Sequence, residues 1–294
     1  MLNRFFVKLS RVYHRNLVKY SDNPRPASYP YVTGDGFRQL ADHIYDEAKT
    51  DFNPDVVKPG QIIFLGNSRI KNFFKEFNGK IKADYVLISH NGDENVDQEA
   101  VGLMDERVKR WYGINVVVKH PKVVPIPLGI ENLHYYVLGI PSNFRAVKKM
   151  NLPKKNRIFY GFTVASNPGQ RQPALDVLSK YPLAETLKGS WLTFRPYLKL
   201  LAGYKFTASP EGSSIEGHRN WDALYMGVSP IVTRSVTTEY FQSLGIPMWL
   251  VDDWRELNSL TEADLDKKYQ ELWKGFDESK LYMDYWVNKI KTLA

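Results

Sequence analysis

Short apolar runs and helical stretches alternate along the middle of the chain. Residues 60–68, GQIIFLGNS, form an apolar run that ends in turn residues, which is typical of a buried parallel strand. Residues 69–77, RIKNFFKEF, have helical spacing, and residues 83–97, ADYVLISHNGDENVD, indicate a second strand followed by a polar loop. This alternation predicts an α/β domain with a mainly parallel sheet.

The same pattern continues to about residue 140 and then breaks. A helical pattern covers residues 99–113, and strands are predicted at 114–120, INVVVKH, and at 122–130, KVVPIPLGI. Residues 141–157, PSNFRAVKKMNLPKKNR, combine prolines with a basic cluster, which suits an interdomain linker or an exposed connection.

Strand and helix signals resume in the second half. The expected strands lie at 157–164, 201–210, 229–233 and 247–254, and the expected helices at 169–181 and 213–227. From Thr261 the chain is helical, and TEAD forms a capping box at its start. No repeat of short period is present.

This pattern predicts four segments. They are a basic amphipathic segment (1–26), a first α/β domain (27–145), a second α/β domain (146–260) and C-terminal helices (261–294).

Composition narrows the class of protein. With 294 residues, 43% of them hydrophobic, the chain can bury the cores of two domains. The absence of cysteine excludes disulfides, thiolate catalysis and cysteine-ligated zinc, and it fits a reducing compartment. No apolar run is long enough to span a bilayer, so we expect a cytoplasmic protein.

Most of the net charge of +8 lies at the start of the chain, because residues 1–26 hold six basic side chains and one acidic one. Apolar and basic positions alternate there with helical spacing. Two interpretations stay open: residues 1–20 contact the inner face of an anionic membrane, or they form a first helix docked on the protein. The rest of the chain is nearly balanced in charge, so nucleic acid is not an expected partner.

Residues 204–232, YKFTASPEGSSIEGHRNWDALYMGVSPIV, place a strand, a turn and a helix in one short segment. Ser213 and Glu216 match the S-x-x-E capping box, which predicts a helix that begins at Ser213, and Gly227 fits the glycine that ends many helices. Free N–H groups and the helix dipole favour an anion at such a helix start.

Charged side chains around this turn suit a nucleotide sugar. Arg219 lies in the first helical turn, where acidic residues are usual, and its guanidinium suits a diphosphate. Glu211 and Glu216 offer acceptors for ribose or sugar hydroxyls. For Glu216 and His218 a structural role is an open alternative, because neither a capping glutamate nor a core histidine needs a ligand.

The segment FTASPEGSSIEGHRNWDALYMGVSPIV resembles the nucleotide-sugar-binding motif of exostosin-like glycosyltransferases, and VLISHNGDEN and VVPIPLGIEN resemble the first halves of bacterial members. The likeness covers residues 60–250 and extends more loosely to α1,3-fucosyltransferases. It implies a GT-B fold, with two Rossmann-like domains facing across a cleft, the donor on the C-terminal domain, and no metal or other cofactor. One departure is Asp222, where glutamate is common in the family.

Two further loops supply candidate residues. Arg171 lies where a loop meets a helix and suits a second diphosphate contact, with a solvated surface arginine as the alternative. After the strand at 83–90, Asp93 is the favoured general base, His90 is next, and Glu94 is a third candidate. Asn132 is an expected acceptor-side contact. The candidate donor-binding residues are Arg171, Ser209, Glu211, Gly212, Glu216, His218 and Arg219.

Motifs of other enzyme classes are missing. Asp252 and Asp253 lack the D-x-D spacing of metal-dependent glycosyltransferases, and Asp253 with Glu256 fits a helix cap. The six histidines have no zinc spacing, and the sequence has no Walker A loop and no G-x-S-x-G elbow.

These patterns together predict an inverting, metal-independent glycosyltransferase. It would use a nucleoside diphosphate sugar as donor and a glycan or lipid-linked glycan as acceptor, in the synthesis of a surface polysaccharide. Two alternatives stay open: an enzyme similar to polysaccharide pyruvyl transferases, and a non-catalytic protein of the same fold that binds nucleotides or glycans.

Overall fold

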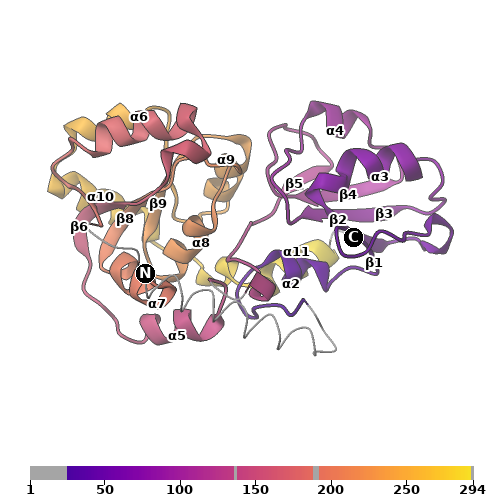
Figure 1. Cartoon of the computed structure of the whole chain (residues 1–294), viewed down its shortest axis with the longest axis horizontal. Coiled ribbons are helices and arrows are strands. Elements are labelled where there is room, and N and C mark those ends of the chain that lie inside the picture. The colour runs from indigo at the N-terminus through magenta and orange to yellow at the C-terminus, as the bar shows by residue number, and fades with distance from the viewer. Residues whose placement is uncertain (1–24, 136–137, 188–191, 293–294) are drawn as a thin grey trace.

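Two parallel sheets organise the computed structural model, which describes residues 25–135, 138–187 and 192–292 (Figure 1). Every strand pair in both five-stranded sheets is parallel, so the α/β class predicted from the alternation is confirmed. In spatial order the first sheet contains β1 (His43–Tyr45), β2 (Gln61–Gly66), β3 (Tyr85–His90), β4 (Val108–Gly113) and β5 (Val123–Pro125). The second contains β10 (Trp249–Val251), β9 (Ser229–Thr233), β8 (Tyr204–Ala208), β6 (Lys155–Tyr160) and β7 (Ala184–Thr186).

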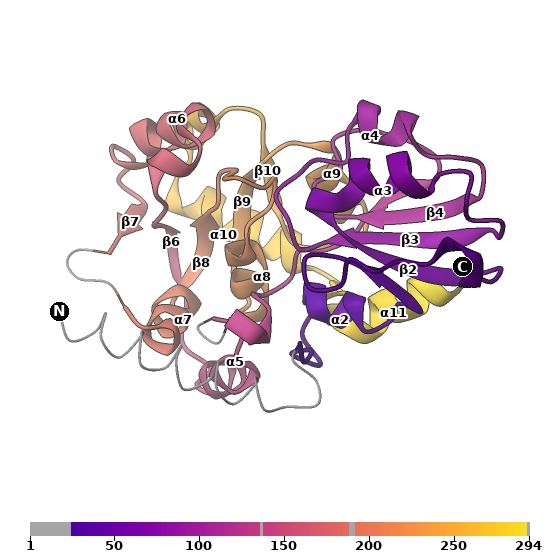
Figure 2. The same cartoon turned by 45° about the vertical axis from the view of Figure 1, so that its right-hand side comes forward.

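Helices cover both faces of each sheet (Figures 1 and 2). Those of the first half are α2 (Gly34–Arg38), α3 (Ile70–Phe77) and α4 (Gln98–Gly102). Those of the second half are α5 (Pro141–Lys148), α6 (Pro168–Leu178), α7 (Phe194–Ala202), α8 (His218–Tyr225), α9 (Val236–Ser243) and α10 (Glu262–Trp273). The last helix is α11 (Met283–Thr292).

The apolar run of β2 is continuous because both faces of this strand are buried. Ile63 and Leu65 belong to a buried cluster with Phe73 of α3, whereas Ile62 and Phe64 belong to the cluster on the opposite face. Successive side chains of a strand point to opposite faces, so a sheet covered on both sides needs apolar residues at every position.

The second sheet is built in the same way. Ile158 and Phe206 pack in a cluster with Val177 of α6, while Phe159 and Tyr204 belong to the cluster that contains residues of α7 and α8.

The chain returns to the first sheet at its end (Figures 1 and 2). The helix α11 lies against that sheet on the face of α2, and Met283 N–H donates to the Pro30 carbonyl over 2.9 Å. Its buried Trp286 and Ile290 belong to the same apolar cluster as Phe64 of β2 and Trp221 of α8. One core therefore joins the two halves.

Most predicted elements are present, and two predictions in the first half are wrong. Residues 108–113 were expected within a helix but form β4 in the middle of the first sheet, with Trp111 fully buried. Residues 114–120 were expected to be a strand, but only Val116 makes an isolated bridge, to Val96. The expected interdomain linker at 141–157 does lie between the first sheet, which ends with β5, and the second, which starts with β6. It begins with the helix α5, whose Phe144 and Val147 are buried, and this helix packs against α7.

The basic amphipathic segment predicted over residues 1–26 lies almost wholly outside the described residues, as does the whole helix predicted within it at 1–20. Arg25 is described and is buried, where it pairs with Asp35, Asp46 and Glu47. This cation belongs to the folded protein and not to the exposed charge of the leading segment. In the described part of the chain, no helix has both the length and the apolar composition to cross a bilayer.

Candidate functional site

Two guanidinium groups meet at the carboxyl ends of β6 and β8. Arg171 on α6 donates to the carbonyls of Glu211 (3.0 Å) and Thr163 (2.9 Å), and Arg219 on α8 donates to the Gly161 carbonyl over 2.8 Å. Gly161 and Thr163 follow β6, and Glu211 follows β8. The helices α6 and α8 thus bring both arginines to the sheet edge at which parallel α/β folds bind ligands.

Neither arginine is neutralised by a carboxylate. Among the described residues, no acidic side chain lies within salt-bridge distance of Arg171 or Arg219. Burial lowers the pKa of the Arg171 guanidinium, and the positive charge of Arg219 lowers it further. Two adjacent cations held by backbone carbonyls have the charge and the donor geometry to bind an anion with two charged groups.

Gly212 allows this arrangement because it has no side chain. A Cβ atom at this position would lie 2.4 Å from Nη2 of Arg171. Asn167 Nδ2 donates to the Gly212 carbonyl over 3.0 Å, while the Asn167 side chain also caps α6 by accepting from Gln170 N–H. The Asn167 side chain therefore connects the loop that contains Gly212 to the start of α6, beside the Arg171 guanidinium.

The loop between β8 and α8 contacts the first half of the molecule. Ser214 Oγ donates to Asp93 Oδ1 over 2.9 Å, and Ile215 N–H donates to Asn115 Oδ1 over 3.2 Å. His218 contacts the Gly129 carbonyl through Nδ1 at 2.8 Å. The expected donor-binding loop is thus also the contact between the two halves.

Glu216 does not cap the helix, which corrects the capping box predicted at Ser213. The helix α8 begins at His218, with Gly217 as its N-cap. Glu216 is buried, and its two carboxylate oxygens accept from Leu128 N–H and from Trp221 Nε1–H. Burial raises the pKa of this carboxyl to about 8. Both oxygens are occupied by protein donors, so the geometry favours the structural alternative for Glu216.

The other residues of the turn differ in how accessible they are. Ser209 is buried, and its N–H donates to the Ile231 carbonyl over 2.9 Å. Glu211 is half-buried, burial raises its pKa, and no described residue hydrogen-bonds to its carboxylate. Glu211 is therefore the carboxylate of this turn that is open to a ligand hydroxyl.

His90 is enclosed by protein. Its side chain is buried, Nδ1 accepts from Asn91 N–H over 2.8 Å, and Nε2 lies 3.1 Å from the Pro127 carbonyl. These partners define a neutral ring with its proton on Nε2. Burial lowers the pKa of His90 to about 4, so the ring is neutral at physiological pH. With both nitrogens engaged, His90 is placed as a structural residue.

Asp93 and Glu94 are exposed in the loop after β3. Asp93 accepts from Ser214 of the second half, whereas Glu94 contributes its backbone carbonyl to Asn67 Nδ2. Of the three candidate bases, Asp93 alone has a side-chain contact with the loop that adjoins the arginines.

Asn132 lies inside a polar network of the first half. Its Oδ1 accepts from Asp35 N–H and its Nδ2 donates to Asn91 Oδ1, both over 2.8 Å. Asp35 is buried and accepts from Nδ1 of His134, which leaves Nε2 of that ring available. Burial opposes ionisation of Asp35, but His134 and Arg25 outweigh it and lower the pKa of this carboxyl.

The Asp35–His134 pair was not predicted from the sequence. A buried carboxylate that orients an imidazole is a common way to prepare a general base. The two residues are 99 positions apart, and no spacing rule relates them. The glycine-flanked Asp35 in TGDGF was the only local signal.

Asp222 is buried beside the candidate donor site. Burial raises the pKa of its carboxyl well above the usual range, the charge of Arg219 opposes this, and Glu131 adds to it. Tyr197 of α7 also contacts Arg219. Asp222, which departs from the motif, therefore lies close enough to Arg219 for the two charges to interact.

No group of three or more histidine, aspartate or glutamate side chains is placed to hold a metal ion in the described ranges. Asp253 and Glu256 form a capping box on the short helix Trp254–Ser259, as predicted.

Comparisons with known proteins give matches in structure only. No family model matches the chain, and no curated protein matches its sequence. Among solved structures, Anabaena HepE with UDP-glucose is similar at 11% identity and a TM-score of 0.43, over 79% of this chain and 79% of that one. An α1,3-fucosyltransferase is similar at 11% identity and 0.41, over 84% and 92%. OtsA without ligand is similar at 10% and 0.48, over 81% and 74%.

Proposed function

We propose that the protein is a glycosyltransferase of the GT-B type that uses a nucleoside diphosphate sugar. It transfers the sugar to a glycan or lipid-linked glycan of a surface polysaccharide, with inversion at the anomeric carbon and without a metal ion. The observation that carries this proposal is the pair of arginines, Arg171 and Arg219, at the carboxyl ends of β6 and β8, where neither forms a salt bridge with any described residue.

The arginines account for the leaving group. When the acceptor oxygen attacks the anomeric carbon, the bond from that carbon to the diphosphate oxygen breaks, and negative charge develops on the diphosphate. Two guanidinium groups stabilise that charge by charge-assisted hydrogen bonds, which is the role that a metal ion has in other transferases. Glu211 lies in the same turn and supplies an acceptor for hydroxyls of the ribose or the sugar.

The resemblance of residues 206–232 to the motif of exostosin-like glycosyltransferases supports the same assignment. The motif places the donor on the second half, which is where the two arginines lie. His218 contacts Gly129 of the first half, so a donor bound here would lie close to the acceptor side.

Asp93 is the proposed general base, which accepts the proton of the acceptor hydroxyl. It is exposed, and it contacts the loop that carries Glu211. His134 is the rival, because Asp35 holds its Nδ1 and leaves Nε2 to accept a proton.

The experiment is a panel of nucleoside diphosphate sugars, with thermal stability and donor hydrolysis as readouts. Wild type is expected to be stabilised by at least one nucleotide and to hydrolyse the matching sugar slowly. Asp93→Asn should keep the stabilisation and lose about 10²–10⁴-fold in turnover. If His134→Gln loses turnover and Asp93→Asn does not, the base is His134. Binding without turnover on any acceptor favours a non-catalytic protein, and no response to any nucleotide overturns the proposal.

A further inference from the structure

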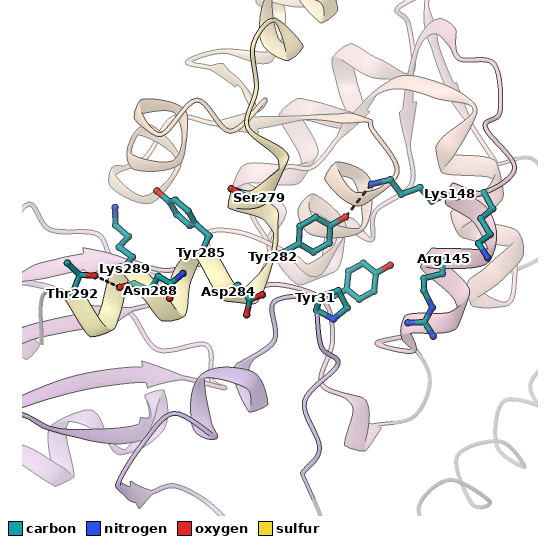
Figure 3. A pocket seen from close by; sticks show the side chains of 12 residues that line it. Tyr31, Arg145, Lys148, Ser279, Tyr282, Asp284, Tyr285, Asn288, Lys289 and Thr292 are labelled. Atoms are coloured by element: carbon teal, nitrogen blue, oxygen red, sulfur yellow. Dashed lines mark hydrogen bonds between the residues drawn. The ribbon is translucent and has the colours of Figure 1, made fainter.

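A large pocket lies between α5 and α11 (Figure 3), and neither Arg171 nor Arg219 lines it. Its volume is about 1120 Å³. The side chains of Tyr31, Tyr282 and Tyr285 line it, and Figure 3 shows the rings of Tyr31 and Tyr282 side by side at its centre. The pocket therefore offers aromatic surface to a ligand.

Basic side chains surround these rings. Four basic residues line the pocket, Arg145, Lys148, Lys149 and Lys289, against one acidic residue, Asp284. Lys148 is neutralised by Glu278, and Asp284 accepts from the hydroxyl of Tyr29. In the described part of the chain, Arg145, Lys149 and Lys289 have no salt bridge.

Lys289 makes cation–π contacts with two tyrosine rings. Its ammonium lies 5.7 Å from the ring centre of Tyr240 and 5.8 Å from that of Tyr285. Burial lowers the pKa of Lys289, and the charge of Lys280 lowers it further. An anion in the pocket would favour the charged form of Lys289 and so offset both effects.

A ligand for this pocket needs an anionic group for the rim and an apolar part for the rings. Tyrosine is enriched where a protein meets the headgroup region of a membrane, and each Lys or Arg near an anionic leaflet contributes about 1 kcal/mol. A lipid with a phosphate headgroup meets both requirements.

The start of the chain supports the same partner. Pro30 and Tyr31 line the pocket, and the described residues begin shortly before them, at Arg25. The preceding segment carries five basic side chains at residues 4, 8, 11, 15 and 19. An anionic surface attracts the basic side chains of this segment as well as those of the rim.

We propose that this pocket binds the phosphate headgroup of an anionic membrane lipid, and that the face formed by α5 and α11 docks on an anionic bilayer. The proposal does not depend on the transferase activity.

Vesicle co-sedimentation of the full chain tests it. Wild type is expected to bind vesicles of phosphatidylcholine with phosphatidylglycerol and not vesicles of phosphatidylcholine alone. The double variant Arg145→Glu/Lys149→Glu should weaken binding by roughly tenfold or more. The control is Lys75→Glu/Lys180→Glu, which changes the net charge equally at exposed positions on α3 and just after α6, the opposite side of the molecule from α5 (Figure 1). Equal loss in both double variants would overturn a specific site.

A fluorescent label tests the pocket itself. Because the chain has no cysteine, Asn288→Cys adds a single thiol at the pocket, and Ser179→Cys adds one at an exposed control position. Anionic vesicles should raise the emission of an environment-sensitive dye at 288 only, and lipids with a spin label should quench it. An unchanged signal at 288 together with unimpaired vesicle binding by the Glu variants would overturn the proposal, and would assign the membrane contact to residues 1–24.

Discussion

At the scale of single residues, several of the titratable groups near the candidate site are structural. His90 and Glu216 were expected near a ligand, yet protein donors and acceptors occupy both nitrogens of the first and both oxygens of the second. Arg171 and Arg219 differ, because each is held by carbonyls and neither forms a salt bridge with a carboxylate in the part of the chain that the structure describes. Arg171 and Arg219 are therefore available to an anion, whereas His90 and Glu216 are not available to a ligand.

His90 makes stability depend on pH. Its pKa is 6.5 in a free side chain and about 4 in the protein, so the unfolded chain binds a proton more readily. Stability is full above the higher value and falls as the pH drops through this window, by up to about 3 kcal/mol. Urea unfolding at pH 7 and pH 4.5 measures the loss.

The variant His90→Gln should show a smaller loss over the same pH interval, and His120→Gln should behave as wild type. An equal loss in wild type and His90→Gln would contradict the role of this ring.

Gly212 is predicted to control the position of Arg171. In Gly212→Ala the added Cβ must displace the guanidinium, because 2.4 Å is too short for a contact with Nη2. Diphosphate affinity should fall by roughly tenfold, the loss of one charge-assisted hydrogen bond, with little change in thermal stability. The control is Gly169→Ala, where the nearest atom is 3.8 Å from the added Cβ. Equal diphosphate affinity in Gly212→Ala and Gly169→Ala would show that Gly212 does not control the position of Arg171.

At the scale of elements, the sequence pattern predicted those strands and helix caps that depend on interactions between residues close in the chain. The strands β2, β3, β6, β8 and β9 and the caps at Thr261 and Asp253 follow from apolar runs and short-range hydrogen bonds, and they are confirmed. The strand β4 does not follow, because VKRWYG continues a helical pattern and is a strand only through pairing with β3 and β5. The helix α7 was missed, although Phe194, Leu198 and Leu201 have helical spacing.

The site was predictable to a similar degree. Arg171 could be selected because it lies at a predicted loop-to-helix junction, and Arg219 because a cation in the first turn of a helix is unusual. The partners of Glu216 are 88 positions away at Leu128 and five away at Trp221, and only the folded chain brings the first of them close. The sequence S-x-x-E is therefore compatible with two roles of Glu216, a helix cap and a contact with the first half, and the local pattern does not distinguish them.

Glu216 is predicted to hold the start of α8 against the first half. In Glu216→Ala, Leu128 N–H and Trp221 Nε1–H lose their acceptor inside the protein, which should cost about 2–4 kcal/mol of unfolding free energy. The control is Glu211→Ala, which removes a carboxylate without a hydrogen-bond partner and should change stability by less than about 0.5 kcal/mol. Similar losses in both variants, measured by denaturant unfolding, would contradict this assignment.

At the scale of the whole molecule, the two halves are predicted to unfold together. One apolar cluster contains residues of both sheets and of α11, and Tyr225 joins three segments by accepting from Val32 N–H and donating to the Leu281 carbonyl. Fluorescence and circular dichroism should therefore give a single coincident transition. Tyr225→Phe should lower its midpoint, at a cost of about 1–3 kcal/mol, without splitting it. Two separate transitions in wild type would show that the halves are independent.

The central claim is that Arg171 and Arg219 together bind the diphosphate of a nucleotide sugar. Calorimetric titration of nucleoside diphosphates into wild type, Arg171→Ala, Arg219→Ala and the double variant tests it directly. The control is Arg110→Ala, which removes an arginine of the first half that also donates to a backbone carbonyl. At least one nucleotide should bind wild type and the control equally, each single variant should bind about 10–100-fold more weakly, and the double variant should not bind measurably. Undiminished affinity in the double variant, or no binding of any nucleoside diphosphate to wild type, would contradict the account.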